Sequence, residues 1–513
     1  DKMKLEKFLQ DNYNYNPNVK DVLKTYIQSW NSWYEGNVKS FHNYFIYNGQ
    51  KKVNQKRFSL NMAKEISEEW SDILWSEKCE ISFKNEKSRN DFDELIEELD
   101  LYSVINQAIE KACALGTEMA VVGVYDIVQN EEGMTLDVSE AKTRVDLVDI
   151  DWIFPLSWNN KGITECAFGS VEYIKGDKYI VLSVHKIDEA SGNYKIYNHL
   201  FLETNGNLTE IKEQNNTITE FDTKSDVKWF ATFRPHLTNN LFKNSPFGIS
   251  IYANAIDNLK ATDISFDGLK NEIVDGKRRT FVRAEMFSYD NGQQRLVFDP
   301  NDTNVYQLPS GATKDDLIQS DSTNLRTAQL IETLNTNLNI LGKKCGFGEN
   351  YYHFDGQALS TATAVISSNS KMFRRKKKLE IGFESAIFDL VEAISYASSE
   401  FGKSSIETDG MVITFDDSIA EDKEAESLRA RAEVSMGLLS KEEYREKIFG
   451  ETPEIAKQKI EEINASNPSV EELLGGKPTK PIVEKDEDDE EEDKKKDQDK
   501  KDKKDKKEDK EKE

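Results

Sequence analysis

Two stretches with a helical spacing of apolar residues flank a short strand-like segment, and this order restricts the fold more than any other feature. The first stretch repeats an apolar residue every seven positions, at Tyr252, Leu259, Phe266 and Ile273. The second alternates spacings of three and four, at Ile331, Leu334, Leu338, Leu341 and Cys345. Such spacing is typical of helices with one apolar face, so the sequence predicts two helices that pack together.

The first helix is predicted to be long. From Gly248 to Gly276 it would measure roughly 40 Å at the rise of an α-helix, which is the length of a strut. Between the helices, residues 279–283 and 294–298 have the composition of two short strands, and Asn291-Gly292 is a strong hairpin signal. A plain helical hairpin with a small β insertion is a second interpretation of the same pattern.

The composition indicates a folded, multi-domain body. A chain of 513 residues with 37% hydrophobic content is long enough for three or four units. The cysteines, Cys79, Cys113, Cys166 and Cys345, have no paired spacing for zinc or redox chemistry, so we expect buried thiols in a reducing compartment. The sequence has no run of 18 apolar residues and no secretory signal pattern, which predicts a soluble, intracellular protein without a membrane partner.

The net charge of −26 argues against a protein that coats nucleic acid, because phosphate binding needs a basic surface. Any contact with DNA must therefore be local. Residues 484–513 contain 17 acids and 12 bases, so about −21 remains on the rest of the chain. Residues 468–513 offer no apolar core and are predicted to be a disordered charged tail.

Along the chain, a helical entry at 18–78 is followed by a strand at 79–83. A helix at 91–115 ends at Gly116, and a buried strand follows at 118–125. Further strands are predicted at 144–150, 164–168, 179–184 and 194–197. The fold class is therefore α+β, with a mostly antiparallel sheet.

The second half of the chain is predicted to be mainly helical. Ser360 can cap a long helix that runs to about Phe401, and residues 411–415 form a strand that can return to the earlier sheet. Residues 421–462 are again helical. Ser440 and Glu443 form a capping box there, and Pro453 occupies the first position of the next helix.

Two segments are candidates for binding. Five consecutive bases, Arg374, Arg375, Lys376, Lys377 and Lys378, encircle the long helix, so some must point at a neighbour or a ligand unless the helix face is simply solvated. The segment 346–356 combines glycines with four aromatic residues and His353. It is predicted to be a mobile contact loop or, alternatively, a loop whose aromatic side chains pack on the body. Its glycine spacing fits neither a dinucleotide fingerprint nor a phosphate loop.

Catalytic chemistry has little support in the sequence. The carboxylate pairs Asp149/Asp151 and Asp416/Asp417 can in principle hold Mg²⁺, as nucleases require, but turn and capping roles are favoured for both pairs. The histidines have no metal spacing, and no serine or cysteine nucleophile motif is present. We therefore predict no catalytic residue, metal or cofactor, with a metal-dependent nuclease or other DNA-processing enzyme as the alternative.

Several short motifs in order resemble a known family. They are Trp30-Asn-Ser-Trp-Tyr-Glu-Gly-Asn, Arg234-Pro-His, Asn239-Asn240, Ser245-Pro-Phe-Gly-Ile-Ser, Gly276-Lys-Arg-Arg-Thr-Phe-Val, Thr361-Ala-Thr-Ala-Val, Asn369-Ser-Lys-Met-Phe and Met436-Gly-Leu-Leu-Ser-Lys-Glu. Their order along the chain, up to about residue 467, resembles the portal proteins of tailed bacteriophages, particularly those of long-tailed phages. No single motif is diagnostic, and the charged tail lies outside the resemblance.

The resemblance implies a ring subunit, usually one of twelve, at one capsid vertex, assembled in the host cytoplasm and present in the virion. The ring would be a conduit for DNA packaging and ejection, without enzymatic activity of its own. The implied parts are N-terminal helices and an α+β wing (1–245), a stem helix (246–276), a clip (277–315), a second stem helix (316–345), a tunnel loop (346–359), a long helix with a return strand (360–418) and a helical crown (419–467).

The same resemblance implies partners and contact residues. The partners would be further copies of the chain, double-stranded DNA, the terminase large subunit, the head-tail connector, and the major capsid and scaffolding proteins. DNA-facing residues would be Lys343, Lys344, Glu349, Asn350, Tyr351, Tyr352, His353 and Phe354. The clip contacts would be Lys277, Arg278, Arg279 and Arg283, and the bases 374–378 would contact a neighbouring subunit or DNA.

Overall fold

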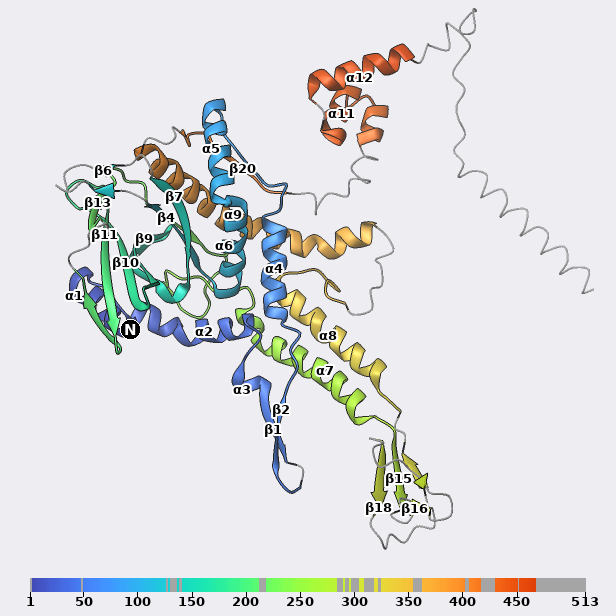
Figure 1. Ribbon diagram of the computed structural model, residues 1–513. Coiled ribbons are helices and arrows are strands. Elements are labelled where there is room, and N and C mark those ends of the chain that lie inside the picture. Colours follow the sequence, from blue (N-terminus) through green and yellow to red (C-terminus); the bar gives the residue numbers. More distant parts are fainter. Residues whose placement is uncertain are drawn as a thin grey trace, which may run out of the picture. The chain divides into compact units, whose positions relative to one another are not determined.

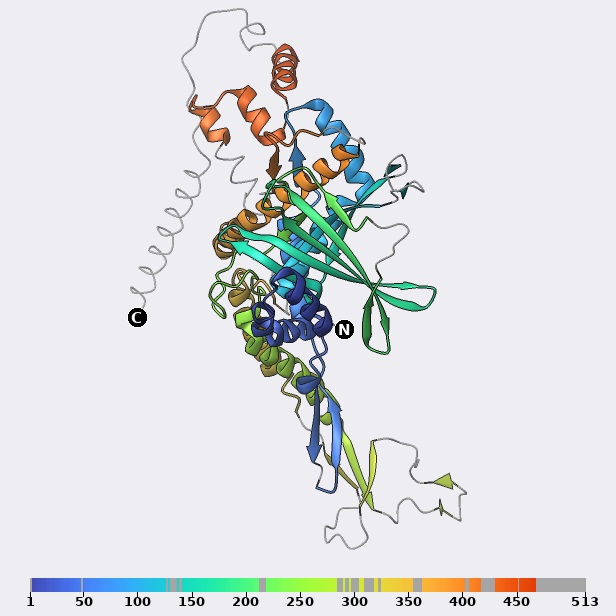
Figure 2. The ribbon, with the colours of Figure 1, turned by 90° about the vertical axis from the view of Figure 1, so that its left-hand side faces the viewer.

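A computed structural model (Figures 1 and 2) describes most of the chain. The described residues are 2–47, 49–125, 128–129, 136–137, 141–211, 218–283, 289–290, 295–296, 304–308, 318–321, 324–353, 362–401, 406–416, 430–450 and 452–466. The predicted charged tail, Asp417 and residues 354–359 of the predicted tunnel loop therefore lie outside them. The chain divides into two compact units, Asp1–Asp422 and Lys423–Glu513.

The largest sheet of the first unit has six antiparallel strands in the order β12-β11-β10-β9-β8, with β13 beside β11. Its strands are β8 (Ile153–Asn159), β9 (Gly162–Ile174), β10 (Asp177–Ile187), β11 (Tyr194–Thr204), β12 (Asn207–Glu210) and β13 (Glu220–Asp222). Helix α1 (Lys2–Tyr13) supplies Leu5 and Leu9 to a core with Phe154 and Leu182. This helix thereby covers apolar side chains of the sheet.

A second sheet has the order β14-β4-β7 and packs against helices α6 (Leu101–Leu115) and α9 (Ala362–Glu400). Its strands are β4 (Glu118–Tyr125), β7 (Lys142–Val148) and β14 (Phe230–Phe233). Gly116, with φ of +85°, ends α6, and a Cβ atom there would lie 2.7 Å from the backbone of Ile249. Only glycine tolerates both this conformation and this close approach. The predicted strand at 118–125 and the predicted helix end at Gly116 are thus present.

The other helices of this core are α2 (Asn18–Tyr34), α3 (Lys39–His42), α4 (Met62–Leu74) and α5 (Glu86–Leu99). The short 3-10 helices are η1 (Ile150–Trp152) and η2 (Ala253–Ala255), and two further short strands are β5 (Val128–Gln129) and β6 (Leu136–Asp137). Strand β20 (Val412–Thr414) pairs with β3 (Glu80–Ser82) in a sheet of their own. With helices and antiparallel strands in one unit, the α+β class is confirmed.

Two of the helical predictions were wrong in detail. Residues 18–78 are not continuously helical, because β1 (Asn43–Tyr47) and β2 (Lys52–Lys56) form an antiparallel hairpin within them. The aromatic and β-branched residues of β1 favour extended structure. The helix predicted at 91–115 is two helices, since Asp100 has a left-handed backbone that separates α5 from α6.

Helices α7 (Ile256–Asp275) and α8 (Thr327–Cys345) correspond to the two helices predicted from the spacing of apolar residues, and they run side by side (Figure 1). Helix α7 starts at Ile256 and not at Gly248, so it is about 30 Å long and not 40 Å. The backbone before it makes other bonds: the Gly248 N–H donates to Thr117 Oγ1, and the Ile251 N–H donates to the Cys113 carbonyl. These tertiary bonds compete with helix formation.

The β insertion pairs differently from the prediction. Strand β15 (Arg279–Arg283) runs parallel to β18 (Val305–Leu308) and antiparallel to β19 (Ile318–Asp321). Strands β16 (Tyr289–Asp290) and β17 (Arg295–Leu296) pair with each other. Strand β15 is therefore paired with β18 and β19 and not with residues 295–296, which pair with β16; the predicted turn at Asn291-Gly292 lies outside the described residues.

The second unit contains α11 (Lys441–Phe449) and α12 (Pro453–Ser466), with a further helical segment at 430–435. The predicted capping box is confirmed: Ser440 Oγ accepts from the Glu443 N–H at 3.0 Å, and the Ser440 N–H donates to Glu443 Oε2 at 2.8 Å. Within the described part of the whole chain, no helix has the length and apolar character needed to cross a membrane.

Candidate functional site

The packing between α7 and α8 is mainly apolar, with one polar contact between the middles of the helices and a polar cluster at the end next to the β insertion. Leu334, Leu338, Leu341 and Cys345 are buried, as their spacing predicted, whereas Ile273 of the other stripe is exposed. Asn337 Nδ2 crosses between the helices and donates to Ser265 Oγ at 2.7 Å. A partly buried amide that finds a partner on the facing helix favours one register of the pair.

Glu272 near the end of α7 holds the start of α8. Its carboxylate accepts from the Arg326 guanidinium at 2.8 and 3.1 Å and from the Arg326 backbone N–H at 3.0 Å. These bonds to Arg326 lower the pKa of Glu272 to about 2. A Cβ atom on Gly276 would lie 2.1 Å from Leu325 Cδ2, so the two chain segments approach closely just before the β insertion.

The described part of the glycine and aromatic loop packs on the body. Phe347 is fully buried and its ring lies 4.9 Å from Trp70 and 4.7 Å from Tyr351. Trp70 Nε1 donates to the Cys345 carbonyl at 3.2 Å, and the Tyr351 hydroxyl donates to Glu69. Of the two predictions for this loop, the one in which its aromatic side chains pack on the rest of the protein therefore holds for residues 346–352.

Among the predicted DNA-facing residues, exposure differs widely. Lys344, Glu349, Asn350 and His353 are exposed and Lys343 is half-buried, while Tyr351 and Tyr352 lie partly buried against the body; Phe354 is outside the described residues. Lys343 Nζ lies 2.7 Å from Glu349 Oε1, and this contact lowers the pKa of Glu349. The Lys371 ammonium donates to the Lys343 carbonyl at 2.7 Å.

The five bases of α9 separate into two groups. Lys376 is 1% exposed and binds Glu380 and the Asp416 carbonyl. Arg375 is half-buried beside Gly346, and burial lowers its pKa. Arg374, Lys377 and Lys378 are exposed. The helix therefore directs part of its charge inward, as the spacing required.

The carboxylate pairs do not form a metal site within the described residues. Asp149 lies 3.1 Å from Lys111 Nζ, and Asp416 contacts Ser76 and Lys78. In the described part of the chain, no three His, Cys, Asp or Glu side chains are close enough to share a metal ion. All four cysteines are buried and free of disulfides, which confirms the predicted buried thiols.

The predicted clip bases lie at the beginning of the β insertion. Lys277, Arg278 and Arg279 are exposed, and Arg278 Nε donates to Ser320 Oγ on β19 at 3.1 Å. Arg279 donates to the Asp275 carbonyl at the end of α7. Arg283 ends β15. Three of the bases thus cluster where the helix pair meets the small sheet.

Comparison with known families identifies the chain. The family model described as phage portal protein, SPP1 Gp6-like, matches residues 15–469. The chain belongs to this phage portal protein family. No curated protein matches it. The match spans the described helices and sheets from α2 onward and stops just after residue 467, where the resemblance predicted from the sequence also ends.

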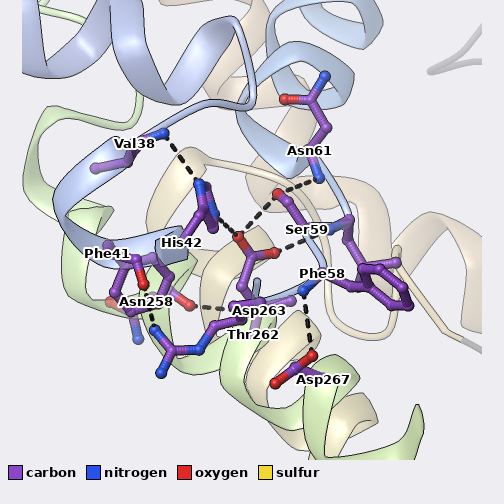
Figure 3. A network of polar contacts seen from close by, with 12 residues as sticks. Val38, Phe41, His42, Phe58, Ser59, Asn61, Asn258, Thr262, Asp263 and Asp267 are labelled. Atoms are coloured by element: carbon purple, nitrogen blue, oxygen red, sulfur yellow. Dashed lines mark hydrogen bonds and ion pairs between the residues drawn. The ribbon is translucent and has the colours of Figure 1, made fainter. Parts of the chain in front are cut away.

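The portal protein also contains a buried polar network that the sequence pattern did not reveal (Figure 3). Asp263 of α7 accepts from Ser59 Oγ at 2.8 Å and from the Leu60 N–H at 2.9 Å, and its Oδ2 lies 3.1 Å from His42 Nε2. One turn further, Asp267 accepts from the Phe58 N–H at 3.2 Å and from the Tyr44 hydroxyl at 3.3 Å.

The hydrogen bonds of this network show which ring nitrogen of His42 carries the hydrogen. The Val38 N–H donates to His42 Nδ1 at 3.0 Å, so Nδ1 is an acceptor and Nε2 carries the hydrogen that points to Asp263. Ser59 donates to Asp263 and not to His42, so this group is not arranged as a nucleophile and its base. In the portal protein its effect is to fasten the β1–β2 hairpin to α7.

Proposed function

We propose that this portal protein assembles into a closed ring of about twelve subunits at one vertex of the capsid. The ring would be the conduit through which double-stranded DNA is packaged and later ejected. The match to the portal family over residues 15–469 carries the proposal. Within it, α7 and α8 are the stem, the insertion at 277–315 is the clip, residues 346–359 are the tunnel loop, and 419–467 form the crown.

The charge distribution supports a conduit that does not hold its DNA tightly. Each phosphate neutralised by a lysine or arginine adds affinity, and many such contacts would stall a moving duplex. The proposed channel residues include few bases, and Lys343 is already paired with Glu349. We assign the DNA contact to the exposed members of the predicted set, Lys344, Asn350 and His353, with Lys343 and Glu349 beside them.

The exposed bases at the start of the insertion favour the clip as the docking site for acidic surfaces of partners. Lys277, Arg278 and Arg279 would meet the terminase large subunit during packaging and the head-tail connector afterwards. The scaffolding and major capsid proteins would contact the outer parts of the ring. Arg374, Lys377 and Lys378 are the members of the basic run that remain exposed for a neighbouring subunit or for DNA.

Electron-microscope imaging and a measurement of the native mass test directly whether the protein forms a ring. The purified chain should give ring-shaped particles with a central opening in negative-stain micrographs, and a native mass of about twelve times 58.8 kDa. Monomers at every concentration, with or without the scaffolding protein, would contradict the proposal.

A packaging assay tests the channel assignment. Rings carrying Lys343→Ala and Lys344→Ala should assemble but package several-fold less DNA, because the bases that guide the duplex are lost. Lys161→Ala with Lys175→Ala is the matched control, since both lysines are exposed in turns of the large sheet. Equal packaging by the two double variants would remove these lysines from the channel. Cleavage of DNA that needs a divalent cation and disappears in Asp149→Asn or Asp416→Asn variants would favour the nuclease alternative.

A further inference from the structure

The β1–β2 hairpin has an unusual charge for this chain. Acids make up 94 of 513 residues, so a stretch of 29 residues contains about five on average, yet residues 36–64 contain none. The same stretch contains six bases, at Lys39, Lys51, Lys52, Lys56, Arg57 and Lys64. A cationic hairpin on a chain of charge −26 is suited to an acidic partner, and other copies of the chain are such partners.

The two faces of the hairpin differ. Tyr44 points toward α7, where its hydroxyl bonds Asp267. Because side chains alternate along a strand, Phe45 and Tyr47 lie on the opposite face, together with the cross-strand neighbours Lys52 and Asn54. Phe45 is 58% exposed and Tyr47 is 64% exposed. Exposed aromatic residues flanked by bases are typical of the anchors of protein interfaces.

A complementary surface lies on α7 itself. The hairpin is held on the side of Asp263 and Asp267, and α8 contacts the side of Ser265. Between these sides, four positions share a sector of about 40° at 100° per residue. They are Asp257, Ile264, Gly268 and Asp275.

This α7 surface is open to solvent and has the required chemistry. Ile264 is 51% exposed, and a Cβ atom on Gly268 would find nothing within 4 Å. Asp275 is exposed, and the side chain of Asp257 is exposed beside Lys260 on the same helix. An apolar centre with an acid at each end thus matches aromatic side chains with flanking lysines.

A single copy cannot join its own two surfaces. Bonds to Asp263 and Asp267 fix the hairpin on a different side of α7, with Phe45 and Tyr47 directed away from the helix. We propose that Phe45 and Tyr47 of one subunit pack on the Ile264 and Gly268 surface of a second copy, with Lys52 and Lys56 toward Asp257 and Asp275. Two different surfaces on each copy form a heterologous interface, which closes a ring at the correct rotation. This inference rests on the proposed ring.

Cross-linking of the full chain tests the contact. In the variants Tyr47→Cys with Ile264→Cys, and Phe45→Cys with Gly268→Cys, mild oxidation or a short bis-maleimide should produce a ladder of covalent multimers. The four native cysteines are buried, so unmodified protein gives the background. Tyr173→Cys with Ile264→Cys is the matched control, because Tyr173 is a 72% exposed aromatic residue on β9. This pair should stay monomeric on denaturing gels.

The outcomes separate the interface from the ring. Rings by native mass without covalent multimers above the control would overturn the interface and leave the proposed function intact. Failure of the unmodified protein to form any ring would overturn both.

Loss of the aromatic anchors gives a second readout. Phe45→Ser with Tyr47→Ser should keep the thermal unfolding temperature of the subunit but raise the protein concentration at half-assembly at least tenfold. Tyr173→Ser should leave assembly unchanged. Unchanged assembly of the double variant would contradict the proposal. If that variant assembled normally and lost duplex DNA retention at low salt, the hairpin would be a nucleic-acid surface and the proposal would be wrong.

Discussion

His42 Nε2 lies 3.1 Å from Asp263 Oδ2, and both side chains are nearly inaccessible to solvent. The carboxylate joins three elements, since it also accepts from Ser59 and from the Leu60 backbone. Buried polar groups are costly when they lose their partners, so this aspartate is a structural residue of α7.

Asp263→Ala should therefore destabilise the subunit by about 3 kcal/mol, because His42, Ser59 and the Leu60 N–H all lose their acceptor. The midpoint of urea unfolding, followed by tryptophan fluorescence, measures the effect. Asp93→Ala, an exposed aspartate within α5, should change the stability by less than about 0.5 kcal/mol. Equal midpoints for the two variants would show that the network contributes nothing.

Glu118 predicts a dependence of stability on pH. Its carboxylate is fully buried, Lys111 Nζ lies 3.7 Å away, and burial raises the pKa of Glu118 to about 8. A carboxyl whose folded pKa is raised binds its proton more tightly in the folded state. Its favourable contribution is therefore complete below its unfolded pKa of about 4.3 and is lost as the pH rises toward 8.

Glu118→Gln should stabilise the subunit, because the amide never has to lose a proton, and the gain should increase by roughly 2 kcal/mol between pH 6 and pH 8.5. Thermal unfolding across that range measures it. Asp149→Asn is the control, because it removes the exposed partner of the same lysine. It should change the free energy of unfolding by nearly the same amount at every pH in this range. A gain that does not change with pH would mean that Glu118 is ionised throughout.

The helix pair offers a test of packing. Leu338→Ala should cost about 2 to 4 kcal/mol, since Leu338 is buried between α7 and α8 and the cavity closes only in part. Ile340→Ala on the same helix removes a partly exposed side chain and should cost less than about 1 kcal/mol. Urea unfolding measures the stability of both variants. A larger loss of stability for Ile340→Ala than for Leu338→Ala would contradict the assigned buried and exposed faces of α8.

The basic run of α9 should respond unevenly to substitution. Lys376→Ala leaves Glu380 buried without this cation and should cost about 3 kcal/mol. Lys378→Ala removes an exposed charge and should leave stability unchanged within about 0.5 kcal/mol. If Lys378→Ala alone reduced ring assembly or packaging, the exposed members of the run would carry the intermolecular role.

Local patterns predicted the elements whose residues interact within a few turns. The α8 stripe from Leu334 to Cys345, the Ser440 capping box and the helix end at Gly116 depend on neighbours in sequence, and all three are present. The β1–β2 hairpin had such a signal as well. Asn48-Gly49 separates two strand-like runs, but the helical patterns on both sides concealed it.

Long-range pairing could not be predicted from these patterns. The parallel contact of β15 with β18 and the contact of β3 with β20 join segments whose partners the sequence does not specify. The same holds at the site. Lys376 and Lys377 are adjacent and chemically identical, and only the position of the Asp416 carbonyl, 40 residues away, distinguishes the buried one. Likewise, Asp263 and Asp267 look like solvent-facing acids until the hairpin covers them.

Two bonds to α7 from the backbone segment directly after the β1–β2 hairpin have a mechanical consequence. The Leu60 N–H binds Asp263 and the Phe58 N–H binds Asp267, at points about 6 Å apart along the helix axis. A single attachment point would allow the hairpin to rotate about it, whereas two attachment points fix the orientation of the hairpin relative to α7. A twist of α7 about its own axis would therefore carry Phe45 and Tyr47 sideways through an arc, so that rotation of this helix would become a lateral displacement of the hairpin.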